Sequence, residues 1–150
     1  MTRLPLLTAT SLALLVPIAP KANPAPNITL IPASALDWAQ TPEGVGFAPL
    51  RGDRTTEPYF AMVRLPAGLK SPAHTKSAAM VGLMVSGEMT HVIAGTNPAD
   101  APRIGPGGYY EIPANLPHVS SCVSQSPCVT LLYQDGAFDF LPVDAAAVTQ

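Results

Sequence analysis

Few side chains in this sequence offer metal-binding, nucleophilic or proton-transfer chemistry. There are three histidines, His74, His91 and His118, and two cysteines, Cys122 and Cys128. Imidazole can hold a metal ion, form hydrogen bonds or transfer a proton near neutral pH. No Ser, His and Asp set, phosphate loop or paired carboxylate stands in a convincing local context, so hydrolase and kinase functions have no support.

The two cysteines enclose the turn-like sequence Val-Ser-Gln-Ser-Pro between two strand-like runs. This arrangement predicts a disulfide between Cys122 and Cys128 that closes a hairpin, with a stabilisation of about 2 kcal/mol from loop entropy. A metal-bound pair and two free thiols are the alternatives. The pair lacks the second pair of ligands that a structural zinc site needs.

Short apolar runs separated by turn residues make up most of the chain. The 18 prolines and 11 glycines interrupt it at close intervals, and no window keeps a helical apolar period for three turns, except for a short one near residues 35–40. Eight runs read as strands: 59–65, 69–76, 80–85, 88–94, 109–112, 118–123, 128–133 and 138–143. With no helix to connect parallel strands, the pattern predicts an antiparallel sandwich or barrel.

Composition narrows the class of protein further. Hydrophobic residues make up 47% of the chain and charged residues 12%, which is enough apolar material for a sizeable core and unlike a disordered chain. The net charge is −2, so we expect no nucleic-acid partner. A length of 150 residues fits one domain.

The N-terminal residues are typical of an export signal, with a short basic start and an apolar run over residues 4–19. An uncleaved anchor is the alternative, although the run is short for a membrane-spanning helix. We expect a signal peptide over 1–22, a flexible arm over 23–34, one folded domain over 35–145 and a tail over 146–150. The mature protein would be periplasmic or secreted, with no membrane attachment after cleavage.

Two segments, 68–87 and 107–122, carry residues at the spacing of a known pair of motifs. The motif positions hold Gly68, His74, Lys76, Met80 and Gly87 in the first segment, and Gly107, Pro113, Asn115, His118 and Cys122 in the second. Together they resemble the two signature motifs of the cupin superfamily. The surrounding sequence is similar to a cupin-like branch of exported bacterial proteins without an assigned activity, which also carries the paired cysteines.

The resemblance implies an all-β fold, a single cupin-type antiparallel jelly-roll barrel of two sheets, with its site inside. In the family, three histidines and a glutamate hold a divalent metal. This chain keeps His74 and His118, but Lys76 replaces the second histidine and Met80 replaces the glutamate. An ammonium about 5 Å from a divalent ion is repelled by roughly 6 kcal/mol at an effective dielectric of 20. We therefore describe the metal motif as degenerate.

His91 is a candidate replacement ligand. If the strand after Gly87 alternates so that Met89, His91 and Ile93 face the interior, then all three histidines of the chain converge there. In the alternative interpretation, His91 is an ordinary strand residue whose ring is hydrogen-bonded.

The first function hypothesis is binding of a small organic molecule, including an anion, inside the barrel. Lys76 would be the charge partner, and His74 and His118 would form hydrogen bonds. The side chains expected to form the apolar walls of this ligand site are Met80, Met84, Tyr110 and Ile112.

Three further hypotheses follow. One is a metal-dependent cupin enzyme of the dioxygenase, isomerase or decarboxylase kind, in which His74, His91 and His118 hold one divalent ion of Fe, Mn, Ni, Zn or Cu. The next is copper binding, favoured by the Met80 thioether, and the last is a purely structural or partner-binding module. From the resemblance, we also expect a homodimer.

Overall fold

The computed structural model describes residues 27–144. The expected signal peptide over 1–22 and the expected tail over 146–150 lie outside the described residues. The chain divides into two units, residues 1–30 and 31–150, and the fold below is that of the second unit. Within the described part, no helix is long and apolar enough to span a membrane.

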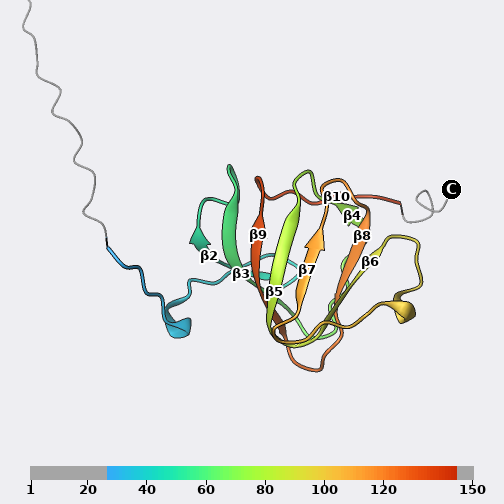
Figure 1. Cartoon of the computed structure of the whole chain (residues 1–150), viewed down its shortest axis with the longest axis horizontal. Helices are drawn as coiled ribbons and strands as arrows, with labels where there is room; N and C mark the ends of the chain where they lie inside the picture. The colour runs from blue at the N-terminus through green and yellow to red at the C-terminus, as the bar shows by residue number, and fades with distance from the viewer. Residues whose placement is uncertain (1–26, 145–150) are drawn as a thin grey trace, which may run out of the picture. The chain divides into compact units, whose positions relative to one another are not determined.

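Two antiparallel sheets make up the fold (Figure 1). The six-stranded sheet has the order β1-β2-β3-β9-β5-β7 and the four-stranded sheet has the order β10-β4-β8-β6. The strands are β1 (Ala39–Gln40), β2 (Gly46–Arg51), β3 (Tyr59–Leu65), β4 (His74–Thr75), β5 (Met80–Ser86), β6 (Met89–Ile93), β7 (Tyr109–Ile112), β8 (His118–Cys122), β9 (Cys128–Gln134) and β10 (Leu141–Pro142). Two short 3-10 turns, Ala33–Ala35 and Pro98–Asp100, lie outside the sheets. This confirms the predicted double-sheet jelly roll.

The core lies between the sheets because most strands alternate between buried and accessible residues. In β3, for example, Tyr59, Ala61, Val63 and Leu65 are buried, and the residues between them are not. The same alternation in β5, β7, β8 and β9 closes one hydrophobic cluster from both sides. Inward-facing positions of the central strands can therefore be recognised from their period of two.

Six of the predicted strands correspond to β3, β5, β6, β7, β8 and β9, but three expectations were wrong. The predicted strand 69–76 shrinks to His74–Thr75, since Pro72 cannot donate a ladder hydrogen bond, and the strand 138–143 shrinks to Leu141–Pro142. The expected helical turn near 35–40 is only the 3-10 turn Ala33–Ala35. Strand β2 was missed, and its pairing with β3 is irregular between Pro49 and Arg51.

Asn115 stands where the second cupin motif has a glycine, and its backbone explains how the chain tolerates this replacement. Its φ is 62°, in the left-handed region that asparagine enters more readily than most other residues. The turn before β8 therefore forms without the glycine. His118 follows this turn as the first residue of β8.

Candidate functional site

His74 and His118 lie directly opposite each other on β4 and β8. Both are buried, at 3% and 2% exposed, and their ring centroids are 4.2 Å apart. Each Nδ1 lies against a backbone carbonyl, that of Pro72 at 2.9 Å for His74 and that of Leu116 at 2.8 Å for His118. A carbonyl only accepts, so each Nδ1 carries the proton, and each neutral ring keeps its lone pair on Nε2.

His91 reaches the same interior from β6. Its Nδ1 is 2.9 Å from the Ser120 hydroxyl, and its ring lies against that of Tyr110 with centroids 4.2 Å apart. The expected alternation holds for Met89, which is buried, and for His91, but Ile93 is 49% exposed. Ile93 is the last residue of β6.

Burial keeps the three imidazoles neutral. It lowers the pKa of His91 and that of His74 from their usual 6.5 to about 4, and the pKa of His118 is also lowered. Loss of solvent is the main cause, and repulsion between the rings adds to it at His74 and His91. At neutral pH the three rings are therefore uncharged.

Two of these rings have an unused nitrogen. The Nε2 atoms of His91 and His118 are buried and have no hydrogen-bond partner among the described residues. Such atoms are unusual in a core and often mark a place for a water, an ion or a ligand. Yet within residues 27–144 no group of three or more His, Cys, Asp or Glu side chains is placed to hold a metal. Neutral imidazole nitrogens are suitable metal ligands, but in the described part of the chain no three such side chains lie close enough together to hold one ion.

Lys76 follows β4 and is 5% exposed. Its ammonium donates to the backbone carbonyl of Asp139 and lies 3.7 Å from the centroid of the Phe138 ring. The Asp139 carboxylate in turn accepts from the backbone N–H of Ser77. Burial lowers the pKa of Lys76 to about 8, so the group is still mostly protonated at neutral pH.

A cavity of about 100 Å³ lies inside the barrel. Its polar lining comprises Tyr59, Lys76, His91, Tyr110, Ser120, Thr130 and Gln134, and its apolar lining comprises Phe47, Val63, Leu65, Met80, Met89, Leu132 and Phe138. None of these lining residues is an aspartate or a glutamate. The cavity therefore contains one cationic group, several hydrogen-bonding groups and no carboxylate of its own.

The residues expected to bind ligand divide into two groups. Lys76, Met80 and Tyr110 line the cavity. Met84 and Ile112 are buried in the surrounding core without lining it. His74 and His118, which were expected to form hydrogen bonds to the ligand, are not among the lining residues. Burial lowers the pKa of both rings, and repulsion from Lys76 adds to this effect.

Tyr110 is placed by a close approach to the backbone. Its direct partner in the β5 and β7 pairing is Gly82, and a Cβ at position 82 would overlap the phenol ring. The ring therefore lies over Gly82, and the Thr130 hydroxyl lies 3.4 Å from the Tyr110 hydroxyl. Burial raises the pKa of Tyr110 to about 12, so the phenol stays protonated.

Sequence reasoning missed the polar residues that β9 and β3 contribute to the cavity. The Tyr59 hydroxyl donates to Gln134 Oε1 at 3.1 Å, and Gln134 Nε2 donates to the Ala137 carbonyl at 3.0 Å. The signal was present in the period of two, because Cys128, Thr130, Leu132 and Gln134 share the buried face of β9. A threonine and a glutamine at inward positions indicate a polar interior.

Cys122 and Cys128 form the predicted disulfide. It joins the end of β8 to the start of β9, and both residues are almost completely buried. The turn between β5 and β6 packs closely against the disulfide, since a Cβ on Gly87 would lie 2.9 Å from the Cys128 sulfur. The disulfide thus fastens the barrel at one end and is separate from the cavity lining.

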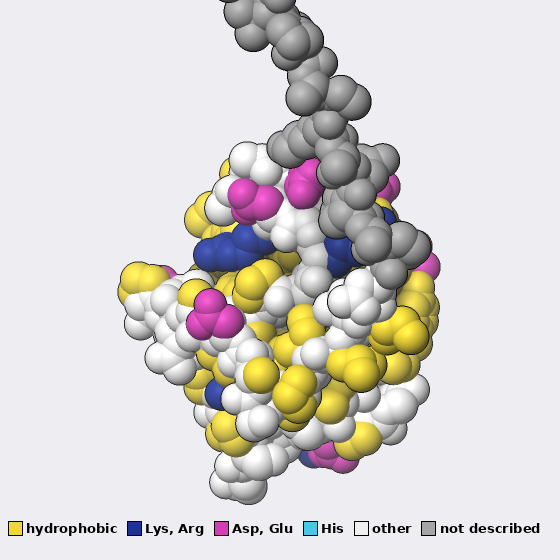
Figure 2. All heavy atoms as spheres, turned by 90° about the vertical axis from the view of Figure 1, so that its left-hand side faces the viewer, with side chains coloured by type: hydrophobic (Ala, Val, Ile, Leu, Met, Phe, Trp, Pro, Cys, Tyr) yellow, Lys and Arg dark blue, Asp and Glu magenta, His cyan; other side chains and the backbone are white. Residues whose placement is uncertain are grey.

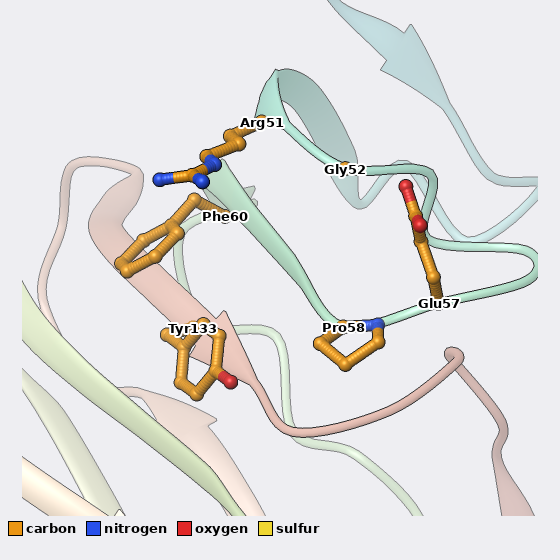
Figure 3. Close-up of a pocket in the computed structure, with 6 residues that line it drawn as sticks. All are labelled: Arg51, Gly52, Glu57, Pro58, Phe60 and Tyr133. Carbon is orange, nitrogen blue, oxygen red and sulfur yellow. The ribbon is translucent and has the colours of Figure 1, made fainter.

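A second hollow, of about 590 Å³, lies outside the barrel (Figure 3). It is lined by Arg51, Gly52, Glu57, Pro58, Phe60 and Tyr133. The rings of Phe60 and Tyr133 form one of its walls, and their centroids are 4.8 Å apart. It is larger than the interior cavity, but it contains none of the histidines and no part of the two motifs.

A two-sheet jelly roll with motif histidines directed inward is the architecture of a cupin. The family model of the ChrR cupin-like domain matches residues 27–137, and the chain therefore belongs to this cupin family. No curated protein sequence matches the chain.

Solved structures show the same fold at low sequence identity. The polyketide cyclase RemF from Streptomyces resistomycificus is 15% identical with a TM-score of 0.63, and the match covers 78% of this chain and 86% of that one. An RmlC-like cupin from Shewanella frigidimarina is 14% identical with a TM-score of 0.58, covering 71% and 89%. KdgF from Halomonas sp. is 15% identical with a TM-score of 0.57, covering 73% and 94%. Such likeness establishes the fold alone.

Proposed function

We propose that this cupin binds a small organic carboxylate inside its barrel, with Lys76 as the charge partner. The observation that carries the proposal is a buried, protonated lysine in the wall of a cavity whose lining has no acidic side chain. A buried ammonium without a counterion is costly. A ligand carboxylate would place a negative charge in direct contact with the ammonium, which the more distant Asp139 carboxylate does not.

The contacts of Lys76 leave it able to bind such a group. No ion pair links Lys76 to an acidic residue in the described part of the chain. Its contacts there are one carbonyl and the rings of Phe138 and Phe140, and the Asp139 carboxylate attracts it from beyond ion-pair distance. An ammonium has three N–H donors, so donors remain for a ligand. The hydroxyls of Ser120 and Thr130 line the same cavity.

The size of the cavity sets the size of the ligand. Pockets for drug-sized molecules measure roughly 300–1,000 Å³, whereas this cavity measures about 100 Å³. Only a molecule of a few non-hydrogen atoms fits without movement of the walls. Formate and acetate are therefore suitable probes.

Calorimetric titration with acetate tests the proposal. We expect Lys76→Met to weaken acetate binding about tenfold or more, as for the loss of a hydrogen bond to a charged group. Lys70→Met is the matched control, because Lys70 is exposed and should leave affinity unchanged. Equal affinity in the wild type and in Lys76→Met would contradict the proposal.

The melting temperature of the same variant gives a second measurement. Removing a buried ammonium that has no acidic partner within ion-pair distance should leave the ligand-free fold as stable as before or more stable. A large loss of stability in Lys76→Met would instead assign Lys76 a structural role through Asp139 and Phe138.

A metal-binding function is the second candidate, favoured by the two unpartnered Nε2 atoms of His91 and His118. With His74, these would offer three neutral nitrogens to one divalent ion of Fe, Mn, Ni, Zn or Cu, provided that the rings turn toward a common point. Such an ion would supply Lewis-acid or redox chemistry. The positively charged Lys76 nearby opposes it.

Elemental analysis separates the two candidates. Stoichiometric metal in the wild type that is absent from a His74→Ala, His118→Ala double variant would establish the metal function. A metal-free wild type after dialysis against each metal, together with acetate binding that needs Lys76, supports the carboxylate function.

We also infer that the protein works in the periplasm or outside the cell. A buried disulfide between Cys122 and Cys128 supports this inference, because such bonds persist in oxidising compartments. N-terminal sequencing of the protein from the exported fraction tests it. A mature chain beginning near residue 23 is the expected result, and an intact N-terminus in the cytosol would contradict it.

A further inference from the structure

The hollow outside the barrel, which we call the outer hollow, has the features of a second binding site. Its volume of about 590 Å³ falls within the roughly 300–1,000 Å³ of pockets for drug-sized ligands. Two side chains of opposite charge, Arg51 and Glu57, line it together with the rings of Phe60, Tyr133 and Pro58. Figure 2 faces the side of the molecule where β2 lies and shows basic and acidic side chains near exposed hydrophobic ones there.

Strand pairing places Arg51, Phe60 and Tyr133 next to one another. Arg51 on β2 is the direct partner of Phe60 on β3, and Phe60 is the direct partner of Tyr133 on β9. Directly paired residues project from the same face of a sheet with Cβ atoms about 5 Å apart. This face is the outward one, because the neighbouring residues Tyr59 and Gln134 are buried in the core. The two rings therefore form one wall of the outer hollow, and the guanidinium lies beside it.

A tight turn between β2 and β3 fixes the Glu57 carboxylate. The backbone N–H groups of Thr56 and Glu57 donate to the Asp53 carbonyl at 3.1 and 3.0 Å, and the backbone N–H of Asp53 donates to Glu57 Oε1 at 3.0 Å. Gly52 begins the turn with a φ of 75°, and a Cβ there would overlap the backbone that returns into β3. The turn thus holds the carboxylate in place and leaves Oε2 available to a ligand.

The two charges of the outer hollow do not neutralise each other. The only ion pair among residues 27–144 joins Arg103 to Glu88, so Arg51 and Glu57 lie beyond ion-pair distance, and Figure 3 shows them on opposite sides of the outer hollow. The Arg51 side chain has no hydrogen bond within the same part of the chain. A guanidinium binds a carboxylate through two parallel hydrogen bonds, and a carboxylate accepts from an ammonium. A ligand that carries both charges would satisfy both sides.

We propose that the outer hollow binds an aromatic zwitterion, either a free aromatic amino acid or a dipeptide that contains one. Arg51 pairs with the ligand carboxylate, and Glu57 pairs with the ligand ammonium. The ligand ring packs against Phe60 and Tyr133, since aromatic rings that pack offset or edge to face stabilise one another beyond the area that they bury. This site is independent of Lys76 and of the barrel interior.

Amide chemical-shift titrations with L-phenylalanine and with alanyl-phenylalanine test the proposal. We expect at least one of them to shift the amides of Arg51, Glu57 and Tyr133, and the tighter ligand identifies the source. The same shifts should persist in Lys76→Met. The proposal is overturned if neither ligand shifts these amides, if alanine binds as tightly as phenylalanine, or if Lys76→Met abolishes the shifts.

Ligands that lack one charge test the two sides separately. Arg51→Met should weaken phenylalanine binding about threefold or more, as for an exposed bidentate ion pair, and should not weaken binding of phenethylamine, which has no carboxylate. Glu57→Gln should weaken phenylalanine binding but not binding of 3-phenylpropanoate, which has no ammonium. Glutamine keeps an oxygen for the Asp53 N–H, so the turn is retained. If a variant weakens both of its ligands equally, its charge does not meet the assigned group and the proposal fails.

Two matched controls complete the experiment. Arg103→Met should leave phenylalanine binding unchanged, because the Arg103 side chain is 66% exposed and does not line the outer hollow. Phe60→Ala should weaken phenylalanine binding several-fold, whereas Tyr109→Ala should not, although Tyr109 is also an exposed aromatic residue on the six-stranded sheet. Circular dichroism of each variant confirms that the fold is kept. Equal affinity in the wild type and in Phe60→Ala would overturn the proposal.

Discussion

Each face of the six-stranded sheet departs from the usual distribution of polar and apolar side chains: the mainly apolar inner face includes buried polar groups, and the outer face includes exposed apolar ones. The inner face buries Tyr59, Thr130 and Gln134 around a cavity, whereas the outer face leaves Phe60 and Leu83 partly open to solvent. A sheet that serves only as a wall would be apolar inside and polar outside. The polar groups on the inner face are those that the proposed carboxylate site uses.

The largest expected contrast comes from two adjacent residues on β5. Met84 is 2% exposed in the core, and its neighbour Leu83 is 44% exposed on the outer face. Met84→Ala should lower the free energy of unfolding by about 3 kcal/mol through lost burial and a cavity. Leu83→Ala should change it by less than about 1 kcal/mol in dilute protein. Urea denaturation measures both changes in the free energy of unfolding. Equal losses for Met84→Ala and Leu83→Ala would contradict the assignment of Met84 to the core and Leu83 to the surface.

Mild acid should act first on the histidines, and all three in the sequence lie on the inner side of the barrel. The folded pKa of His91 is about 4 against its usual 6.5, so the unfolded chain takes up the proton first as pH falls. Stability is complete above the unfolded pKa and declines between about pH 6.5 and about pH 4. His91 alone should cost about 2 kcal/mol between about pH 7 and about pH 5.

Melting temperature against pH, for metal-free protein, measures this loss. His91→Gln should make the decline shallower, since it removes one of the titrating groups. A melting temperature that does not change over the same range would show that the three rings are not buried as neutral groups.

A smaller contrast compares two tyrosines on opposite faces. The Tyr59 hydroxyl donates to Gln134 within the core at 3.1 Å, and the Tyr133 hydroxyl donates to Asp135 at the surface at 3.0 Å. Tyr59→Phe should cost about 1–2 kcal/mol, because it leaves the Gln134 oxygen buried without a donor. Tyr133→Phe should be nearly neutral. A larger loss for Tyr133→Phe in thermal unfolding would contradict the assignment of the polar interior.

The sequence predicted the barrel well because the strong signals were local. The period of two in β3, β5 and β9 and the turn residues between strands identified the central strands, and the Cys122 and Cys128 pair was also recognised. Strand β2 was missed, since Pro49 lies within it and its pairing partner β3 is what keeps it extended. The short β4 and β10 were overestimated, because apolar composition does not reveal where ladder hydrogen bonds end.

The site was only partly predictable. Motif spacing brought His74, His118 and Lys76 together, and the alternation of β6 added His91. No local pattern reports that Gly82 admits the ring of Tyr110, or that Lys76 lies on Phe138. These contacts depend on residues that are far apart in the chain and meet only when the barrel closes.

The most direct test of the central claim is an amide chemical-shift map of the protein titrated with acetate. The account predicts shifts at the cavity residues Lys76, His91, Ser120 and Thr130, and none of them in Lys76→Met. Shifts confined to the outer hollow at Arg51 and Tyr133, or shifts at the cavity that persist in Lys76→Met, would contradict the claim that the barrel interior binds a carboxylate through Lys76.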